Sequence, residues 1–361
     1  MERAKYDYLI VGAGLYGAMF AHTANKKGKR CLVIEKNSHI GGYCYTENMH
    51  GIEVHKFGAH IFRTNSKKVW DFVNEICEFV PFVNSPIANY QGEIYNLPFN
   101  MNTFNQVFGV TTPADAIKAI DRDKVVFSNP KNLEEHCLSI VGRKIYEIFI
   151  KGYTEKQWGM KCTELPASIM NRIPVRFTFD NNYFNEKYQG IPKCGYTEFI
   201  RRLIDGTELW LSTDFFDNVD SFRSIAKEIV YTGQIDKFYN YKFGKLDYRS
   251  VRFEHEYLPN IDSLYGNAVV NFTDESVPYT RIIEHKHFDR FNTCDGTVVS
   301  KEYPVDYKEN CSPSYPILTE GNKVLYAKYS DLAKAEENVI FGGRLAEYKY
   351  YSMNDIIEQF V

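Results

Sequence analysis

A glycine-rich turn between a strand and a helix constrains the fold of this chain more than any other feature. The apolar, β-rich run Tyr6–Val11 ends at this turn, and a helical stretch follows it. The turn carries glycines in the pattern G-x-G-x-x-G: Gly12, Gly14 and Gly17. The first glycine permits a tight turn, the second lets a pyrophosphate approach the backbone, and the third lets the helix pack closely on the strand. We therefore predict a dinucleotide-binding βαβ unit here rather than an ordinary turn.

An acidic residue and a second glycine pair indicate which dinucleotide is bound. Glu35 ends the next apolar run, Arg30–Glu35, where a carboxylate accepts the hydroxyls of an unphosphorylated ribose. Gly41 and Gly42 follow shortly afterwards and extend the motif as FAD proteins do, whereas an NAD domain normally continues into a regular helix. We therefore predict FAD as the cofactor.

The C-terminal part of the chain carries a second candidate contact with the cofactor. A predicted strand ends in two glycines directly before Arg344, and Ser352 precedes an apolar helical stretch that starts at Met353. Ser352 with Asp355 resembles a helix N-cap, so we expect a second helix N-terminus to face the flavin. A surface position is the alternative for Arg344, but this setting favours cofactor contacts for Arg344 and Met353.

Length and composition exclude several classes of protein. At 361 residues the chain exceeds the size at which one hydrophobic core stops growing, so we expect two or three domains. The 43 basic and 46 acidic residues leave a net charge of −3, which gives no reason to expect nucleic-acid binding. The chain has no apolar run of membrane-spanning length and no signal-peptide pattern, so we expect a cytoplasmic protein without membrane insertion.

The cysteines and histidines do not predict a metal site. The eight cysteines are scattered without a C-x-x-C pair, and we expect them to be reduced thiols. His285 and His287 would face one side of a predicted strand, but no third ligand accompanies them. We therefore interpret this pair as part of a sheet.

Three kinds of residue pattern predict a mixed α/β fold. A Rossmann-like FAD-binding domain, discontinuous in sequence, is expected to comprise residues 1–78, 190–235 and 321–361. Helical periodicity predicts a helical insertion domain at residues 99–165. Alternating apolar and polar residues predict an antiparallel substrate domain, with a mobile loop, at residues 79–98, 166–189 and 236–320.

Several long strings of residues occur together in one enzyme family. The longest and most unusual is RIPVRFTFDNNYF, at Arg172–Phe184. The others are HKFGAHIF, YNLPFNMNTF, KGYTEKQWG, YTGQID, VNFTD, VPYTRIIEHKHF and FGGRLAEYKYYSM. Together they closely resemble the prokaryotic UDP-galactopyranose mutases, and the resemblance runs from about Tyr6 to Met353.

The resemblance implies an isomerase that interconverts UDP-galactopyranose and UDP-galactofuranose, for surface glycans, without net redox change. In this family the N5 atom of reduced FAD attacks the anomeric carbon as UDP leaves. The covalent flavin–galactose adduct opens through an iminium and recloses as the five-membered ring, and UDP returns. The resemblance also implies a homodimer, and a flavin reductant such as NAD(P)H or a reductase.

The resemblance assigns several residues to a UDP-galactose site. Arg172 and Arg281 match two arginines that bind the pyrophosphate, where charge-assisted hydrogen bonds would retain the departing diphosphate. A solvated loop or strand position is the alternative for each. The loop that carries Arg172 is expected to close over the substrate and exclude water. Five aromatic residues also match substrate contacts of the family. Tyr183 is expected at the uracil, and Tyr315 and Tyr350 are expected at the phosphates. The other two are Tyr153 and Trp158.

Two further assignments and two departures complete the comparison with the family. His60 matches a histidine beside the flavin, and we expect this catalytic-site residue to position groups rather than transfer a proton. Asn84 is assigned to the sugar. Ser352 stands where the family commonly has Asp, and Arg63 replaces a frequent His, but neither change removes a group that the mechanism needs.

Two other functions stay open at this point. A flavin oxidoreductase that shares the dinucleotide domain would turn over its flavin against an electron acceptor. A nucleotide-sugar binding protein would hold FAD and bind UDP without isomerising the sugar.

Overall fold

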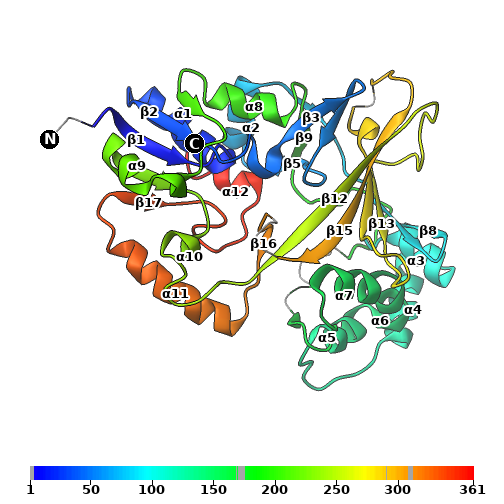
Figure 1. Ribbon diagram of the computed structural model, residues 1–361. Helices are drawn as coiled ribbons and strands as arrows, with labels where there is room; N and C mark the ends of the chain where they lie inside the picture. Colours follow the sequence, from blue (N-terminus) through cyan, green and yellow to red (C-terminus); the bar gives the residue numbers. More distant parts are fainter. Residues whose placement is uncertain (1–3, 168, 170–174, 290, 308–311) are drawn as a thin grey trace.

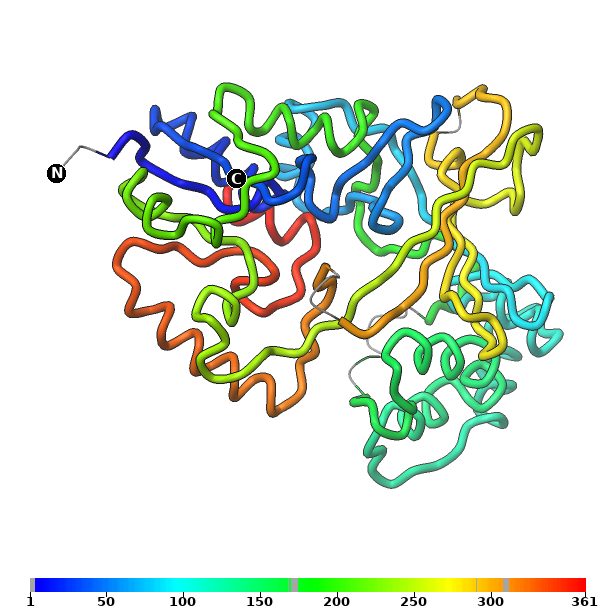
Figure 2. Tube along the Cα trace, in the orientation of Figure 1, coloured from blue at the N-terminus to red at the C-terminus, as the bar shows by residue number. Residues whose placement is uncertain are grey.

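A sheet of five parallel strands forms the first layer of the molecule. The computed structural model describes residues 4–167, 169, 175–289, 291–307 and 312–361. In spatial order the strands are β10 (Glu208–Trp210), β2 (Cys31–Ile34), β1 (Tyr6–Val11), β11 (Ala226–Tyr231) and β17 (Val339–Phe341). Segments far apart in sequence thus share one sheet, and Figure 2 shows the C-terminal chain (red) beside the N-terminal chain (blue).

Both faces of this sheet are buried, because successive side chains of a strand point to opposite sides. Ile10 and Val33 belong to the core on one face, and Leu9 and Leu32 belong to the core on the other. The first face is covered by α1 (Leu15–Lys26), α8 (Tyr196–Leu203) and α12 (Met353–Ile357), and the second by α9 (Val219–Ile225).

A seven-stranded sheet forms the second layer, and its long strands cross the molecule (Figure 1). In spatial order the strands are β16 (Tyr315–Pro316), β12 (Tyr248–Leu258), β15 (Thr297–Asp306), β14 (Arg281–Glu284), β13 (Val269–Phe272), β7 (Ile87–Tyr90) and β8 (Glu93–Asn96). Neighbours pair antiparallel, apart from the parallel pair β13 and β7. The register of β14 on β15 sets Arg281 opposite Glu302, which places a candidate site arginine beside a carboxylate.

A group of helices lies against one end of this sheet (Figure 1). They are α3 (Met101–Phe108), α4 (Pro113–Asp123), α5 (Leu133–Ile140), α6 (Gly142–Ile145), a π-helical turn (Tyr146–Lys151) and α7 (Gly152–Trp158). Asn100, Thr112 and Asn132 cap α3, α4 and α5 by accepting a backbone N–H with their side chains. These helices share one apolar core with parts of β7 and β8.

Two small sheets and three more helices complete the described fold. The first small sheet pairs β3 (Thr46–Met49) with β4 (Ile52–His55). The second has β9 (Tyr188–Pro192) between β5 (Phe62–Thr64) and β6 (Phe79–Pro81). The helices are α2 (Lys67–Ile76), α10 (Ile235–Phe238) and α11 (Glu320–Lys334). Strands β6 and β9 pair antiparallel with each other in the second of these small sheets. The domain bounds as a whole stay a prediction.

One pair of cysteines contradicts the prediction of reduced thiols. Cys77 and Cys194 form a disulfide, and their Cα atoms are 6.7 Å apart. The pairing of β6 with β9 sets Phe79 opposite Pro192 and so brings the two cysteines together. Their separation of 117 residues in the sequence conceals this proximity.

Within the described residues, no helix combines the length and apolar character that crossing a bilayer requires.

Candidate active site

A groove at the carboxyl ends of β1 and β2 is lined by the predicted glycines. Gly12 has a φ of +107° and Gly42 a φ of +53°, which are conformations that glycine adopts without strain. A Cβ on Gly42 would lie 3.1 Å from the Cα of Gly14. Gly41 N donates to Ala13 O at 2.9 Å. The two glycine motifs therefore lie against each other, and their bare main chain leaves room for a pyrophosphate.

Glu35 and Gly17 support this groove in different ways. The carboxylate of Glu35 is buried and accepts hydrogen bonds from Ala13 N at 2.9 Å and from Asn37 Nδ2 at 2.7 Å. Oε1 also accepts from Asn37 N at 2.9 Å, whereas Oε2 keeps a further lone pair, which a ribose hydroxyl could use. A Cβ on Gly17 would lie 2.1 Å from Gly12 O, so this glycine serves the packing of α1 on the turn.

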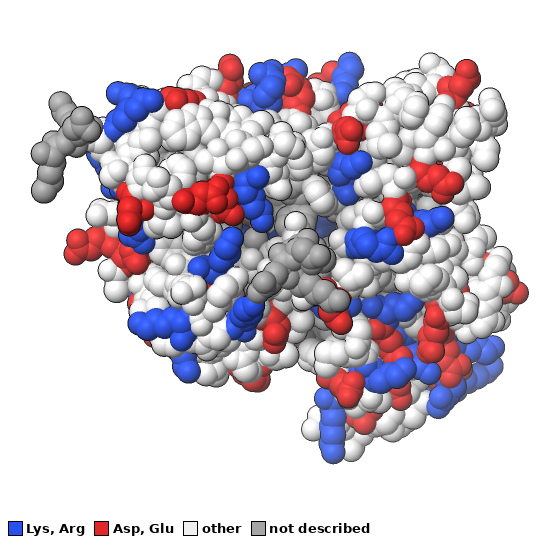
Figure 3. Space-filling view, in the orientation of Figure 1, with Lys and Arg blue, Asp and Glu red and all other residues white. Residues whose placement is uncertain are grey.

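A cavity of about 1030 Å³ opens beside the groove. Both spaces are lined by Tyr43, Phe57, His60, Ser312, Arg344 and Met353. Figure 3 shows Lys and Arg side chains around a hollow in the middle of the molecule. Since the whole chain has a net charge of −3, this concentration of cations is local and suits an anionic ligand.

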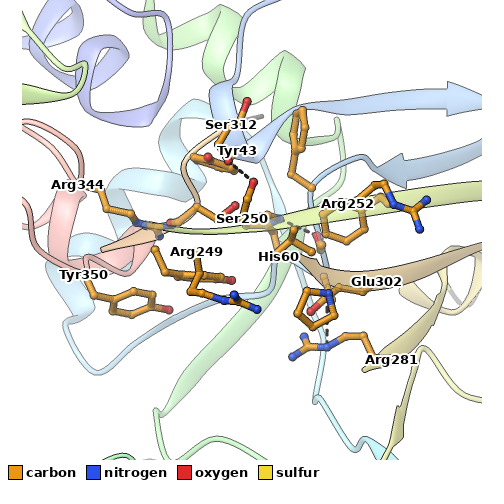
Figure 4. A pocket seen from close by; sticks show the side chains of 18 of the residues that line it. Tyr43, His60, Arg249, Ser250, Arg252, Arg281, Glu302, Ser312, Arg344 and Tyr350 are labelled. Atoms are coloured by element: carbon orange, nitrogen blue, oxygen red, sulfur yellow. Dashed lines mark hydrogen bonds and ion pairs between the residues drawn. The ribbon is translucent and has the colours of Figure 1, made fainter. Parts of the chain in front are cut away.

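Arg281 lies in the cavity beside Glu302 (Figure 4), and two partners from different elements hold it. Its Nη2 donates to Tyr153 Oη on α7 at 2.7 Å, and its Nε lies 3.4 Å from Glu302 Oε2 on β15. Burial alone would lower the pKa of Arg281, but the charge of Glu302 and the interactions with Tyr153 together outweigh burial and raise that pKa. Burial raises the pKa of Glu302, and the charge of Arg281 opposes this rise. The guanidinium stays charged and is 28% exposed toward the cavity.

His60 lies where the groove and the cavity meet. Burial lowers its pKa to about 4, so the ring is neutral near pH 7. Its Nδ1 is 2.7 Å from Gly58 O, and because a carbonyl only accepts, Nδ1 carries the proton. Its Nε2 is then a hydrogen-bond acceptor. The backbone N–H of His60 donates to His55 Nδ1 at 3.1 Å, which fixes the turn that carries the ring.

Arg344 lies between the two spaces and not on the outer surface (Figure 4). Its guanidinium donates to Ser314 O at 3.1 Å and to Tyr351 O at 2.9 Å. The same group lies 5.0 Å from the ring centre of Tyr350 and 5.7 Å from that of Tyr315. The structure therefore brings Arg344 and these two tyrosines together.

The remaining residues predicted to contact the substrate are not among the described residues that line the cavity. Tyr183 N donates to the carbonyl of Asn84 at 2.8 Å, and both residues are close to the cavity without lining it. Trp158 packs against the core of the helical group instead of the cavity wall. Arg172 lies outside the described residues, and so does most of the loop expected to close over the substrate. These assignments stay predictions.

Strand β12 supplies cavity residues that the sequence did not single out. Arg249 is only 8% exposed in its side chain, donates to Gln157 O at 3.3 Å and forms an ion pair with Asp306. Arg252 also lines the cavity. In the sequence, Arg249 and Arg252 stand out only as polar residues of an alternating strand. This pattern does not distinguish a cavity residue from an ordinary surface residue.

His285 and His287 do not lie on a strand as predicted. They belong to a 3-10 turn, His285–Phe288, that follows β14. His285 Nε2 is 2.6 Å from Ser300 Oγ, and His287 Nε2 is 2.8 Å from Ser263 Oγ. A search of the described residues finds no group of three or more ligands that could hold a metal ion.

The two departures from the family pattern both have partners. Ser352 caps α12, accepting from Asp355 N at 3.2 Å while its own N–H donates to Asp355 Oδ2 at 2.7 Å. Arg63 pairs with Glu186 at 2.5 Å and lies 4.3 Å from the ring centre of Phe184. Both residues line the cavity.

Comparison with known sequences gives consistent matches. The family described as UDP-galactopyranose mutase (GLF) matches residues 148–350, and an NAD(P)-binding Rossmann-like domain matches residues 10–76. A protein of Klebsiella pneumoniae described as "Probable UDP-galactopyranose mutase" is 40% identical over 98% of this chain and 92% of its own length. A dTDP-fucopyranose mutase of Escherichia coli is 38% identical over 97% of this chain and 95% of its own length.

Solved structures share the fold. The crystal structure of a reduced UDP-galactopyranose mutase aligns with a TM-score of 0.71 at 12% identity, covering 98% of this chain and 93% of that one. A fatty acid isomerase from P. acnes aligns with a TM-score of 0.60 at 12% identity, over 99% and 98% of the two chains. The mixed α/β fold with a Rossmann-like domain is thereby confirmed.

Proposed function

Because this chain belongs to the UDP-galactopyranose mutase family, we propose that it interconverts UDP-galactopyranose and UDP-galactofuranose. The observation that carries this proposal is the junction at His60, where the cation-lined cavity opens into the glycine-lined groove. A sugar diphosphate in the cavity then lies beside a cofactor in the groove. Isomerisation requires that the departing nucleotide stays bound until it rejoins the sugar.

The groove is assigned to FAD. A side chain at Gly42 would fill the space against Gly14, so the bare main chain suits a pyrophosphate, and Glu35 Oε2 has a lone pair for a ribose. When bound in its reduced form, FAD supplies an electron-rich N5 to the anomeric carbon. NAD(P)H or a reductase is the proposed source of its electrons.

The side chains of the cavity hold the leaving group and orient the sugar. Arg281 keeps a positive charge at the diphosphate because Glu302 raises its pKa, and Tyr153 fixes the plane of the guanidinium. A charge-assisted hydrogen bond from such a group contributes about 1.5–3 kcal/mol. Tyr315 and Tyr350 are assigned to the phosphates. Neutral His60 offers Nε2 as an acceptor at the junction.

A second candidate is the same ring contraction on dTDP-fucopyranose. The E. coli dTDP-fucopyranose mutase is 38% identical to this chain, against 40% for the K. pneumoniae protein, so overall similarity does not separate the two nucleotide sugars. The two substrates differ in the base, in the 2′-hydroxyl of the ribose and at the sugar C6. Direct comparison of the two substrates therefore decides between them.

The test is to incubate the dithionite-reduced, anaerobic protein with UDP-galactofuranose and to detect UDP-galactopyranose by chromatography while recording the flavin spectrum. We expect many turnovers without flavin oxidation. Absence of product overturns the proposal, and product formed only with stoichiometric flavin oxidation identifies an oxidoreductase. Binding of UDP without turnover identifies a nucleotide-sugar binding protein. A parallel incubation with dTDP-fucopyranose tests the second candidate.

The setting of the reaction follows from the family. We place the enzyme in the cytoplasm as a homodimer that makes UDP-galactofuranose for surface glycans. Sedimentation analysis of the flavin-loaded protein tests the homodimer.

A further inference from the structure

Lys156 lies beside the substrate cavity in a cage of main-chain oxygens. Its ammonium group donates to the carbonyls of Phe272 and Asp274 at 2.8 Å each, of Val277 at 3.0 Å and of Tyr279 at 3.1 Å. An ammonium group carries three protons, so two of these four acceptors share one. Lys156 belongs to α7, whereas the carbonyls lie at the end of β13 and in the turn before β14. The cage therefore fastens the helical group to the seven-stranded sheet.

This contact lies next to the pair that holds the candidate diphosphate site. Tyr153 precedes Lys156 by one turn of α7, and Arg281 begins β14 directly after the caged turn. Arg281 Nη2 donates to Tyr153 Oη at 2.7 Å across the same boundary. A second close contact stands beside it, because a Cβ on Gly152 would lie 2.4 Å from Thr273 O. A shift of α7 relative to the turn would therefore separate Tyr153 from Arg281.

We infer that Lys156 is a positioning residue for substrate binding, because its caged ammonium holds the Tyr153–Arg281 pair in place for the diphosphate. This inference rests on the proposed function, which assigns the diphosphate to Arg281. An uncharged side chain at position 156 would leave the four carbonyls without their hydrogen-bond donor. The contact between α7 and the turn before β14, which holds Tyr153 beside Arg281, would then be weakened.

The ammonium group of Lys156 can lose its proton at a moderately alkaline pH. Burial lowers its pKa to about 8, and the nearby carboxylates of Asp274 and Glu275 oppose that shift. The charges that act on Lys156 are those of Asp274 and Glu275, and the elements packed around it also carry Tyr153, Glu155, Tyr279 and Arg281. Burial raises the pKa values of Tyr153 and Tyr279. The pKa of Arg281 is raised by the charge of Glu302, against the effect of burial. Burial would raise the pKa of Asp274, but its hydrogen bond to Ser276 contributes to lowering that pKa. Lys156 therefore loses its positive charge as pH rises from 7 to 9.

The test measures binding of UDP-galactopyranose to the oxidised, flavin-loaded protein by calorimetry at pH 7 and pH 9. The diphosphate of this ligand is a diester and does not titrate in that range. We expect binding by the parent protein to weaken about fivefold from pH 7 to pH 9, because a group of pKa about 8 is nine-tenths neutral at pH 9 and the neutral form should bind about tenfold more weakly. Lys156→Met should bind about tenfold more weakly already at pH 7 and show no further loss. Lys156→Arg keeps its charge at both pH values, so its affinity should not change with pH.

Lys151→Met is the matched control, because Lys151 is 42% exposed and its ion pair with Glu275 is long, at 3.9 Å. It should bind as the parent does. Parent binding that is equal at pH 7 and pH 9, or Lys156→Met binding equal to the parent, overturns the inference. If Lys156→Met does not fold with its flavin, the pH comparison of parent and Lys156→Arg decides. Failure of the parent to bind UDP-galactopyranose at pH 7 counts against the proposed function instead.

Discussion

The dinucleotide groove and the substrate cavity meet at His60 but are built differently. The groove depends on bare main chain, because Gly14 and Gly42 lie against each other at the carboxyl ends of two adjacent parallel strands. The cavity is made of charged side chains from separate elements, such as Arg281 of β14 and Glu302 of β15. A side chain added in the groove should therefore weaken cofactor binding. A charged side chain removed from the cavity should instead lower activity on the substrate.

The largest effect is expected from Arg281→Ala. This change removes the cation that faces the diphosphate and leaves Glu302 buried without its partner. We expect the rate of isomerisation to fall on the order of 10²–10³-fold, the range seen when one donor to a developing anion is lost. Chromatography of the two UDP-galactose isomers measures the rate.

The absorbance of the flavin is the control for Arg281→Ala. Because Arg281 lines the cavity but not the groove, the purified variant should keep its yellow cofactor. Wild-type activity would refute the assignment of Arg281, and a colourless protein would contradict the separation of the two regions.

The difference between the two regions also explains what the sequence could reveal. The groove follows from a local pattern, because Gly12 to Gly42 lie within one βαβ unit whose strands and turns are readable from residue types. The cavity depends on the register of β14 on β15 and on the packing of α7 against the sheet. Arg281 was therefore identified through the family resemblance, whereas Arg249 and the cage around Lys156 required the structure.

One wrong prediction results from a long-range contact and another from a local turn of the backbone. Cys77 and Cys194 meet through the pairing of β6 with β9, which residue spacing does not disclose. His285 follows the end of β14, where alternation still suggests a strand although the backbone has already turned.

A smaller effect, on the other region, is expected from Gly14→Ala. Gly14 has a φ of −80°, which alanine tolerates, and the nearest atom that its Cβ would meet is Gly42 Cα at 3.9 Å. The protein should therefore fold, while the new methyl group occupies the space of the pyrophosphate. Overpacking a close contact costs about 1–3 kcal/mol, so FAD should bind about 10- to 100-fold more weakly.

Titration of the apoprotein with FAD measures the effect of Gly14→Ala. Gly321→Ala is the matched control, because its Cβ would meet only Thr319 Oγ1, at 4.0 Å, far along the chain in α11. Undiminished FAD affinity in Gly14→Ala would show that the cofactor does not approach the backbone at this turn.

The smallest effect is expected from Ser352→Ala, at the edge where α12 meets the cavity. Ser352 accepts from Asp355 N, and losing such a cap costs about 1 kcal/mol, so the thermal midpoint should fall by at most about 2 °C. Ser352→Asp keeps a capping oxygen and adds a carboxylate to the cavity wall, so it should keep the midpoint and instead raise the KM for UDP-galactofuranose through repulsion of the diphosphate. Calorimetric scans and initial rates of both variants separate these effects. Equal loss of stability in the two variants would show that the cap is not what Ser352 contributes, and an unchanged KM in Ser352→Asp would place this residue away from the bound diphosphate.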